Sequence, residues 1–121
     1  MRQAVKLLAF AVLTMPLMPA HASLPREMIG EWRWEQYTVA VSECRLDRLC
    51  AKVIAGPKNV GMEIFASNLI PKADDLVGQI VHPDSKEIYN TRFHKINADT
   101  WRLDGCIAMR VCLSGEFTRV K

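Results

Sequence analysis

Residues 76–96, LVGQIVHPDSKEIYNTRFHKI, contain the pattern that decides the fold. Residues 76–82 are mainly apolar, Pro83-Asp84-Ser85 is a turn sequence, and residues 88–96 alternate between apolar and polar side chains. Alternation with a period of two is typical of a β-strand with one buried face, and a cluster of Pro, Asp and Ser is typical of a turn. The stretch therefore predicts an antiparallel β-hairpin.

The same signals recur on both sides of this hairpin. Trp32 and Trp34 alternate with charged residues, and further apolar or β-branched runs lie at residues 38–41, 49–55, 100–106 and 112–120. Residues 59–70 fit either a short helix or an irregular strand, with Pro71 and Asp74-Asp75 marking a turn after them. About seven or eight short strands separated by turn sequences predict an all-β domain, a small antiparallel barrel or sandwich.

The first 22 residues have the features of an export signal. Arg2 and Lys6 precede an apolar run at residues 7–15, and Ala20-His21-Ala22 provides small residues at the two positions that signal peptidase reads. We expect cleavage after Ala22, a single mature domain of residues 23–121, and a periplasmic or secreted location. The apolar run is shorter than the roughly 20 residues that a membrane-spanning helix requires, so we expect no membrane span in the mature chain.

The net charge of the chain comes partly from this signal. The chain has 16 Lys and Arg against 13 Asp and Glu, a net charge of +3. Without Arg2 and Lys6 the count is 14 against 13, and the remaining basic residues are interspersed with acidic ones, as in residues 45–48. Because binding of nucleic acid depends largely on neutralising phosphates with clustered Lys and Arg, we expect no nucleic-acid partner.

All four cysteines lie within the predicted mature domain. Cys44 and Cys50 enclose five residues, and so do Cys106 and Cys112. Cysteines exported to an oxidising compartment are expected to form disulfides, and of the three possible connectivities the spacing favours two local pairs, each at the neck of a hairpin. Zinc sites and redox-active pairs typically use Cys-x2-Cys spacing, which the chain lacks. We therefore expect the disulfides Cys44–Cys50 and Cys106–Cys112, no metal and no cofactor.

A set of short motifs extends over the predicted mature domain. They are Gly78 to Asp84 followed by Lys86 and Tyr89, Gly30 to Trp32, Cys44 with Leu49-Cys50, Leu103 to Cys106, and Thr118 to Val120. In this order and spacing they resemble the family known as domain of unknown function 2147, over residues 29–121. The resemblance implies an exported up-and-down β-barrel similar in fold to lipocalins, with no settled biochemical activity.

The aromatic residues of the predicted strands are the candidate binding residues. Side chains at such positions most often fill a core. Alternatively they line the mouth of a barrel that holds one small apolar or amphipathic ligand, with a basic residue meeting an acidic headgroup. The candidate residues for this ligand-binding site are Trp34, Tyr89, Arg92, Phe93 and Trp101.

The sequence contains no evident catalytic constellation. His82 lies beside the predicted turn and His94 about nine residues beyond it, so at roughly 3.3 Å per residue they are too far apart for one metal or acid–base cluster. Asp74-Asp75 lies in a turn sequence, where adjacent acids are usually solvated.

We expect a non-enzymatic binding protein for a small ligand. The alternative is a protein-interaction or inhibitor module of the cell envelope that acts through disulfide-stapled loops. The oligomeric state stays open.

Overall fold

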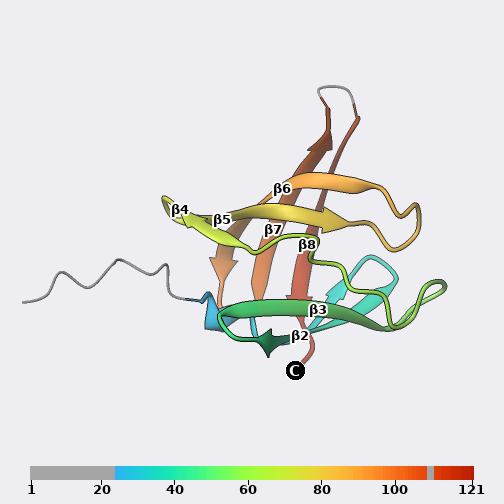
Figure 1. The fold of residues 1–121 in the computed structure, drawn as a ribbon, viewed down its shortest axis with the longest axis horizontal. Helices are drawn as coiled ribbons and strands as arrows, with labels where there is room; N and C mark the ends of the chain where they lie inside the picture. The colour runs from blue at the N-terminus through green and yellow to red at the C-terminus, as the bar shows by residue number, and fades with distance from the viewer. Residues whose placement is uncertain (1–23, 109–110) are drawn as a thin grey trace, which may run out of the picture.

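The computed structural model describes residues 24–108 and 111–121, which form the predicted all-β fold (Figure 1). A 3-10 turn, Arg26–Met28, precedes the strands. Within the described residues there are eight antiparallel strands: β1 (Gly30–Trp34), β2 (Tyr37–Arg45), β3 (Arg48–Ala55), β4 (Ile70–Lys72), β5 (Asp75–Val81), β6 (Ile88–Asn97), β7 (Thr100–Ile107) and β8 (Val111–Arg119).

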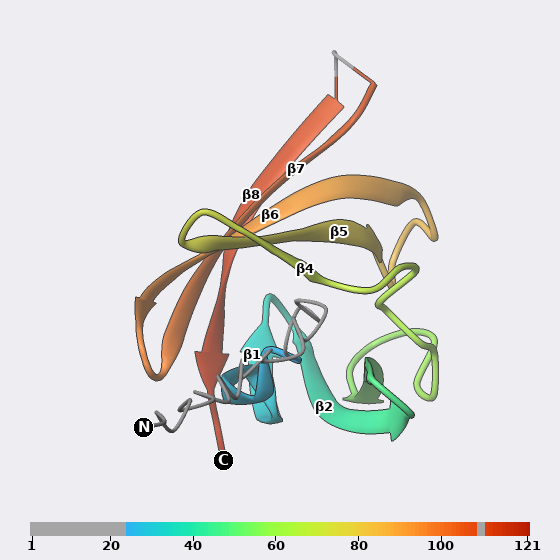
Figure 2. The ribbon, with the colours of Figure 1, turned by 60° about the vertical axis from the view of Figure 1, so that its left-hand side comes forward.

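The strands form one curled sheet in the order β3-β2-β1-β8-β7-β6-β5-β4. Strands that follow one another in the chain are neighbours in this sheet, except β3 and β4, which lie at its two edges. β1 and β8 also pair with each other. This is the up-and-down order of a barrel that is open between β3 and β4, and the sheet curls into a half-barrel (Figure 2).

The chain between β3 and β4 lies across this opening. The Ile64 N–H donates to the Ala51 carbonyl of β3 at 2.7 Å, and the Ile64 carbonyl accepts from the Val81 N–H of β5 at 2.8 Å. Phe65 also forms an isolated bridge with Ile80. Of the two alternatives for residues 59–70, the irregular extended segment is therefore correct and the short helix is wrong.

Large side chains from inward-facing strand positions fill the interior. Phe117 lies at the centre, with its ring centroid 5.5 Å from that of Trp34 and 5.2 Å from that of Phe93. Alternation along β6 places Tyr89, Thr91 and Phe93 inside and the residues between them outside. Burial of these aromatic side chains is the main stabilising contribution to such a small domain.

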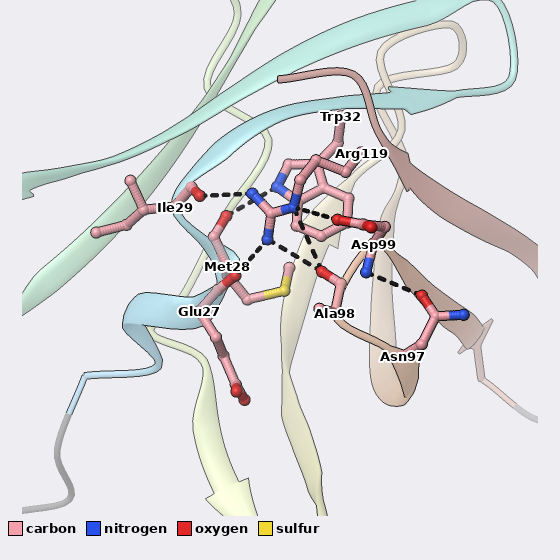
Figure 3. Close-up of polar contacts among 8 residues, drawn as sticks. All are labelled: Glu27, Met28, Ile29, Trp32, Asn97, Ala98, Asp99 and Arg119. Carbon is pink, nitrogen blue, oxygen red and sulfur yellow. Dashed lines mark hydrogen bonds and ion pairs between the residues drawn. The ribbon is translucent and has the colours of Figure 1, made fainter.

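Arg119 of β8 closes one end of the half-barrel (Figure 3). Its Nη1 donates to the Ile29 carbonyl at 3.0 Å, and its Nη2 donates to the carbonyls of Glu27 at 2.8 Å and Ala98 at 3.2 Å. The guanidinium lies over the ring of Trp32, 4.3 Å from the centroid. One side chain thereby joins the last strand to the N-terminal turn and to the turn between β6 and β7.

Candidate binding surface

Four of the five predicted ligand-binding residues lie inside the packed interior. Trp34 and Phe93 have no exposed surface, Trp101 is 1% exposed and Tyr89 is 7% exposed. Trp34 and Phe93 therefore border no space that a water molecule could enter. Arg92 lies on the outer face of β6, so the structure does not bring it together with the aromatic residues. The ligand-binding role of these five residues stays a prediction.

On that outer face Arg92 belongs to a cross-strand cluster around Asp75. Arg92 Nη1 lies 2.7 Å from Asp75 Oδ2, and His94 Nδ1 lies 2.6 Å from Asp75 Oδ1. The hydrogen bond from Arg92, followed by that from His94, holds the pKa of Asp75 below its ordinary value. The prediction of a solvated acid in a turn is wrong for Asp75, because this residue begins β5 and pairs directly with His94.

His82 lies at the other end of the β5–β6 hairpin from His94. Its Nε2 is 3.2 Å from Glu35 Oε2, its Nδ1 accepts from the Asp84 N–H at 3.1 Å, and its ring packs 5.0 Å from that of Trp34. These contacts join the turn after β1 to the turn after β5. The two histidines do not converge, and within residues 24–108 and 111–121 no group of three His, Cys, Asp or Glu is placed to hold a metal ion.

Further polar groups lie near His82, at the end of the half-barrel that holds the turns after β1 and β5. Burial raises the pKa of the Tyr37 phenol, and the Asp84 carboxylate raises it further. Asp84 also accepts a hydrogen bond from Lys58 at 3.1 Å, which raises the pKa of that lysine. Asn59 donates to the Pro83 carbonyl at 2.6 Å. The contacts of Lys58 and Asn59 join the loop after β3 to the turn between β5 and β6, which is a structural role.

Both predicted disulfides are confirmed, Cys44–Cys50 and Cys106–Cys112, and they are typical of a protein that folds in an oxidising compartment. The first ties the β2–β3 hairpin, at whose tip Leu46 is 91% exposed. The second ties the β7–β8 hairpin. The two disulfides lie toward opposite ends of the half-barrel, because β2 runs past the start of β1 whereas β8 begins beyond the end of β1.

The β7–β8 hairpin projects from the body of the fold (Figures 1 and 2). The last pair that β6 forms with β7 on this side is Asn90–Cys106, and β1 pairs with β8 only at the far end. Beyond the Asn90–Cys106 pair the hairpin carries two apolar strand residues: Ile107 is half-buried, and Val111 is 53% exposed. A stiffened, partly apolar arm outside the body of a fold is suited to contact another molecule.

The spacing of Cys106 and Cys112 predicts a disulfide on this hairpin, but no local sequence pattern predicts the projection. The projection arises where strand pairing stops. β8 continues past the end of β1, and β7 continues past Asn90, the last β6 residue that pairs with it, although β6 itself begins at Ile88. Comparison of the chain with family models, with curated proteins and with solved structures finds no match. The resemblance to domain of unknown function 2147 therefore stays a prediction. Among the described residues, no helix has the length and apolar character needed to cross a membrane.

Proposed function

We propose that the protein is an exported, non-enzymatic interaction module that binds another protein of the cell envelope through the β7–β8 hairpin. The observation that carries this proposal is the projection of a disulfide-bonded hairpin beyond the strands that flank it. The predicted signal, residues 1–22, lies outside the described residues. The two disulfides support a periplasmic or extracellular place of action.

The hairpin has the properties of a pre-organised contact surface. The Cys106–Cys112 disulfide restricts the arm before binding, so less conformational entropy is lost when a partner orders it. Val111 offers apolar area that the fold itself does not bury. Backbone pairing continues to Ile107 and Val111, the strand residues nearest the tip. The arm therefore keeps strand geometry without support from neighbouring strands.

The packed interior favours this proposal over a small ligand held inside the barrel. Phe65, Phe93 and Phe117 are each no more than 1% exposed, and they occupy the space in which such a ligand would lie. A ligand inside would have to displace these aromatic side chains, at a loss of several kcal/mol of packing free energy on the order of a large-to-small core substitution.

Site-specific photo-crosslinking in the native host tests the proposal. A photoreactive amino acid at Val111 is expected to give one discrete adduct with an envelope protein, and the same amino acid at Ile54, an exposed residue of β3, is expected to give none. Native mass spectrometry of the purified protein is expected to give the mass of the mature chain alone. A co-purified small molecule, together with no adduct at Val111, would instead support a ligand inside the barrel.

A further inference from the structure

We infer that the partner binds by adding an extended strand to the free edge of β8 at residues 111–115. This inference rests on the proposed function and specifies how the hairpin makes contact. The recognised chemistry is a peptide segment in β conformation, with a basic side chain on one face and an apolar side chain on the other.

The edge is free because β1 is too short to cover it. β8 pairs with β7 over its length, from Ile107–Val111 to Thr100–Thr118. It pairs with β1 only at Trp32–Arg119 and Arg33–Thr118, after which β1 ends and the chain turns toward β2. Within the described part of the chain, no strand lies on this side of residues 111–115.

The direction of the backbone groups follows from the hydrogen bonds at the end of β8. The Arg119 N–H donates to the Asp99 carbonyl on the β7 side, and the Val120 N–H donates to the Glu31 carbonyl on the β1 side. Successive residues of a strand point their N–H and C=O groups to opposite sides. The backbone groups of Cys112 and Ser114 therefore point away from β7, toward the free edge.

The disulfide gives an independent indication of the same direction. Cys106 and Cys112 are directly paired, with a Cα–Cα distance of 4.0 Å. Such a short distance is typical of a non-hydrogen-bonded antiparallel pair, in which the backbone groups of the two residues point away from each other. The Cys112 N–H and C=O are thus available to an added strand, and those of Ser114 lie two residues further along the same edge.

The side chains on the two faces define what the added strand carries. On the outer face a shallow hollow of about 250 Å³ is lined by Arg102, Ser114, Gly115 and Glu116. Arg102 already pairs with Asp104 at 3.3 Å, whereas Glu116 has no ion-pair partner within the described residues. A Lys or Arg of the added strand fits beside Glu116. The adjacent residue of that strand points to the other face, where Leu113 and Val111 offer apolar contact.

The same charges argue against a second copy of this chain as the occupant. Antiparallel pairing of two β8 edges about Ser114 would place Glu116 opposite Cys112 of the second copy, where no positive charge lies. A different protein with a basic residue in an extended segment can form an ion pair with the Glu116 carboxylate, and a second copy in that register cannot. The inference therefore commits to a heterologous peptide strand.

The test uses the oxidised mature protein and a displayed library of random decapeptides. Enriched peptides are expected to share a basic residue next to an apolar one, and the tightest is synthesised as the probe. Ser114→Pro removes the outward N–H, which the fold does not use, and Ser114→Ala removes only the hydroxyl. We expect Ser114→Pro to weaken binding of the probe by at least about tenfold and Ser114→Ala by less than about twofold, since proline is tolerated where a strand N–H faces solvent.

Hydrogen exchange of the unsubstituted protein gives a second readout that does not depend on the proline variant folding. The amides of Cys112 and Ser114 are expected to exchange rapidly in the free protein and slowly with the probe bound. The amides of Leu113 and Gly115 face β7, so they are expected to be protected in both states.

Other outcomes separate the inference from the function on which it rests. Binding that weakens in Val111→Ser but not in Ser114→Pro overturns strand addition and leaves the hairpin as a contact surface. A dimer that Ser114→Pro dissociates replaces the peptide with a second copy and also overturns the inference. Failure of every enriched peptide to protect the amides of Cys112 and Ser114 overturns the inference, whereas the absence of an adduct at Val111 in the crosslinking experiment overturns the proposed function.

Discussion

Replacing Arg119 with alanine is expected to destabilise the closed end of the half-barrel. The guanidinium donates to three backbone carbonyls, those of Glu27, Ile29 and Ala98, and covers the ring of Trp32. The carbonyls belong to two segments that precede β1 and β7. Without Arg119 these segments lose the side chain that joins them to β8.

The magnitude follows from these contacts. A hydrogen bond to a charged group contributes about 1.5–3 kcal/mol. The Arg119 side chain is 24% exposed, so the lower end applies and water partly replaces the lost bonds. The cation–π contact adds about 0.5–1 kcal/mol. The pair with the exposed Asp99 carboxylate adds little. We expect Arg119→Ala to lower the free energy of unfolding by about 3 kcal/mol, which in a domain of this size lowers Tm by roughly 15 °C.

Urea unfolding of the oxidised protein, followed by tryptophan fluorescence, measures this loss. Arg119→Lys keeps the charge but cannot reach carbonyls in both segments, so it is expected to lose about 1–2 kcal/mol. Arg102→Ala is the matched control, because its guanidinium is 59% exposed and pairs with Asp104 on the outer face. We expect the control to change the free energy of unfolding by less than about 0.5 kcal/mol. If Arg119→Ala were no more destabilising than Arg102→Ala, the role of Arg119 in closing this end would be refuted.

Three further predictions concern a turn, the disulfides and the pH dependence of stability. Gly56→Ala is expected to lower the free energy of unfolding by about 1–3 kcal/mol in the same urea assay, because Gly56 has φ +152° and a Cβ there meets the Tyr37 ring. Cys106→Ser with Cys112→Ser, and separately Cys44→Ser with Cys50→Ser, are each expected to lose about 2 kcal/mol. In a binding assay with the crosslinked partner, only the first pair is expected to weaken binding. Asp75→Asn removes a carboxylate whose pKa is lowered in the folded state, so the stability that ionised Asp75 contributes is present above about pH 4 and is lost as the pH falls through the lowered value. Unfolding measured between pH 2 and 7 is expected to show the variant less stable at neutral pH and the difference shrinking in acid, and a difference that is constant with pH would contradict this.

The sequence predicts those parts of the fold whose signals are local. Alternation over residues 88–96 places Tyr89 and Phe93 on one face, and the structure has both inside β6. The two disulfides were predictable because each pair lies across the neck of a single hairpin. β4 was not predicted, because it has three residues, contains Pro71 and lies at the sheet edge, where proline is tolerated.

The remaining features depend on contacts between distant parts of the chain. The segment around Ile64 is extended because its two sides bond to Ala51 and Val81, and its own residues carry no strand pattern that would indicate this. The position of Arg92 is different, since alternation in β6 already assigns it to the face opposite Phe93. That local signal was sufficient to separate Arg92 from the aromatic residues. The projection of β7 and β8 depends on where each strand begins and ends, and local sequence patterns locate such boundaries only within a few residues.

The two disulfides have the same spacing but different surroundings, and this difference bears on where the protein binds. The β2–β3 hairpin is held near its tip by Arg26, which pairs with Glu43 at 2.7 Å, and by Arg48, whose Nη2 donates to the Phe65 carbonyl at 3.1 Å. Its disulfide reinforces a region that the fold already packs. The described part of the β7–β8 hairpin beyond Cys106 has no flanking strand, so the Cys106–Cys112 disulfide chiefly fixes the geometry of the arm itself. Both disulfides stabilise the folded chain, but only in the β7–β8 arm does the disulfide also order a surface that no neighbouring strand supports, and such order before binding favours recognition of a partner.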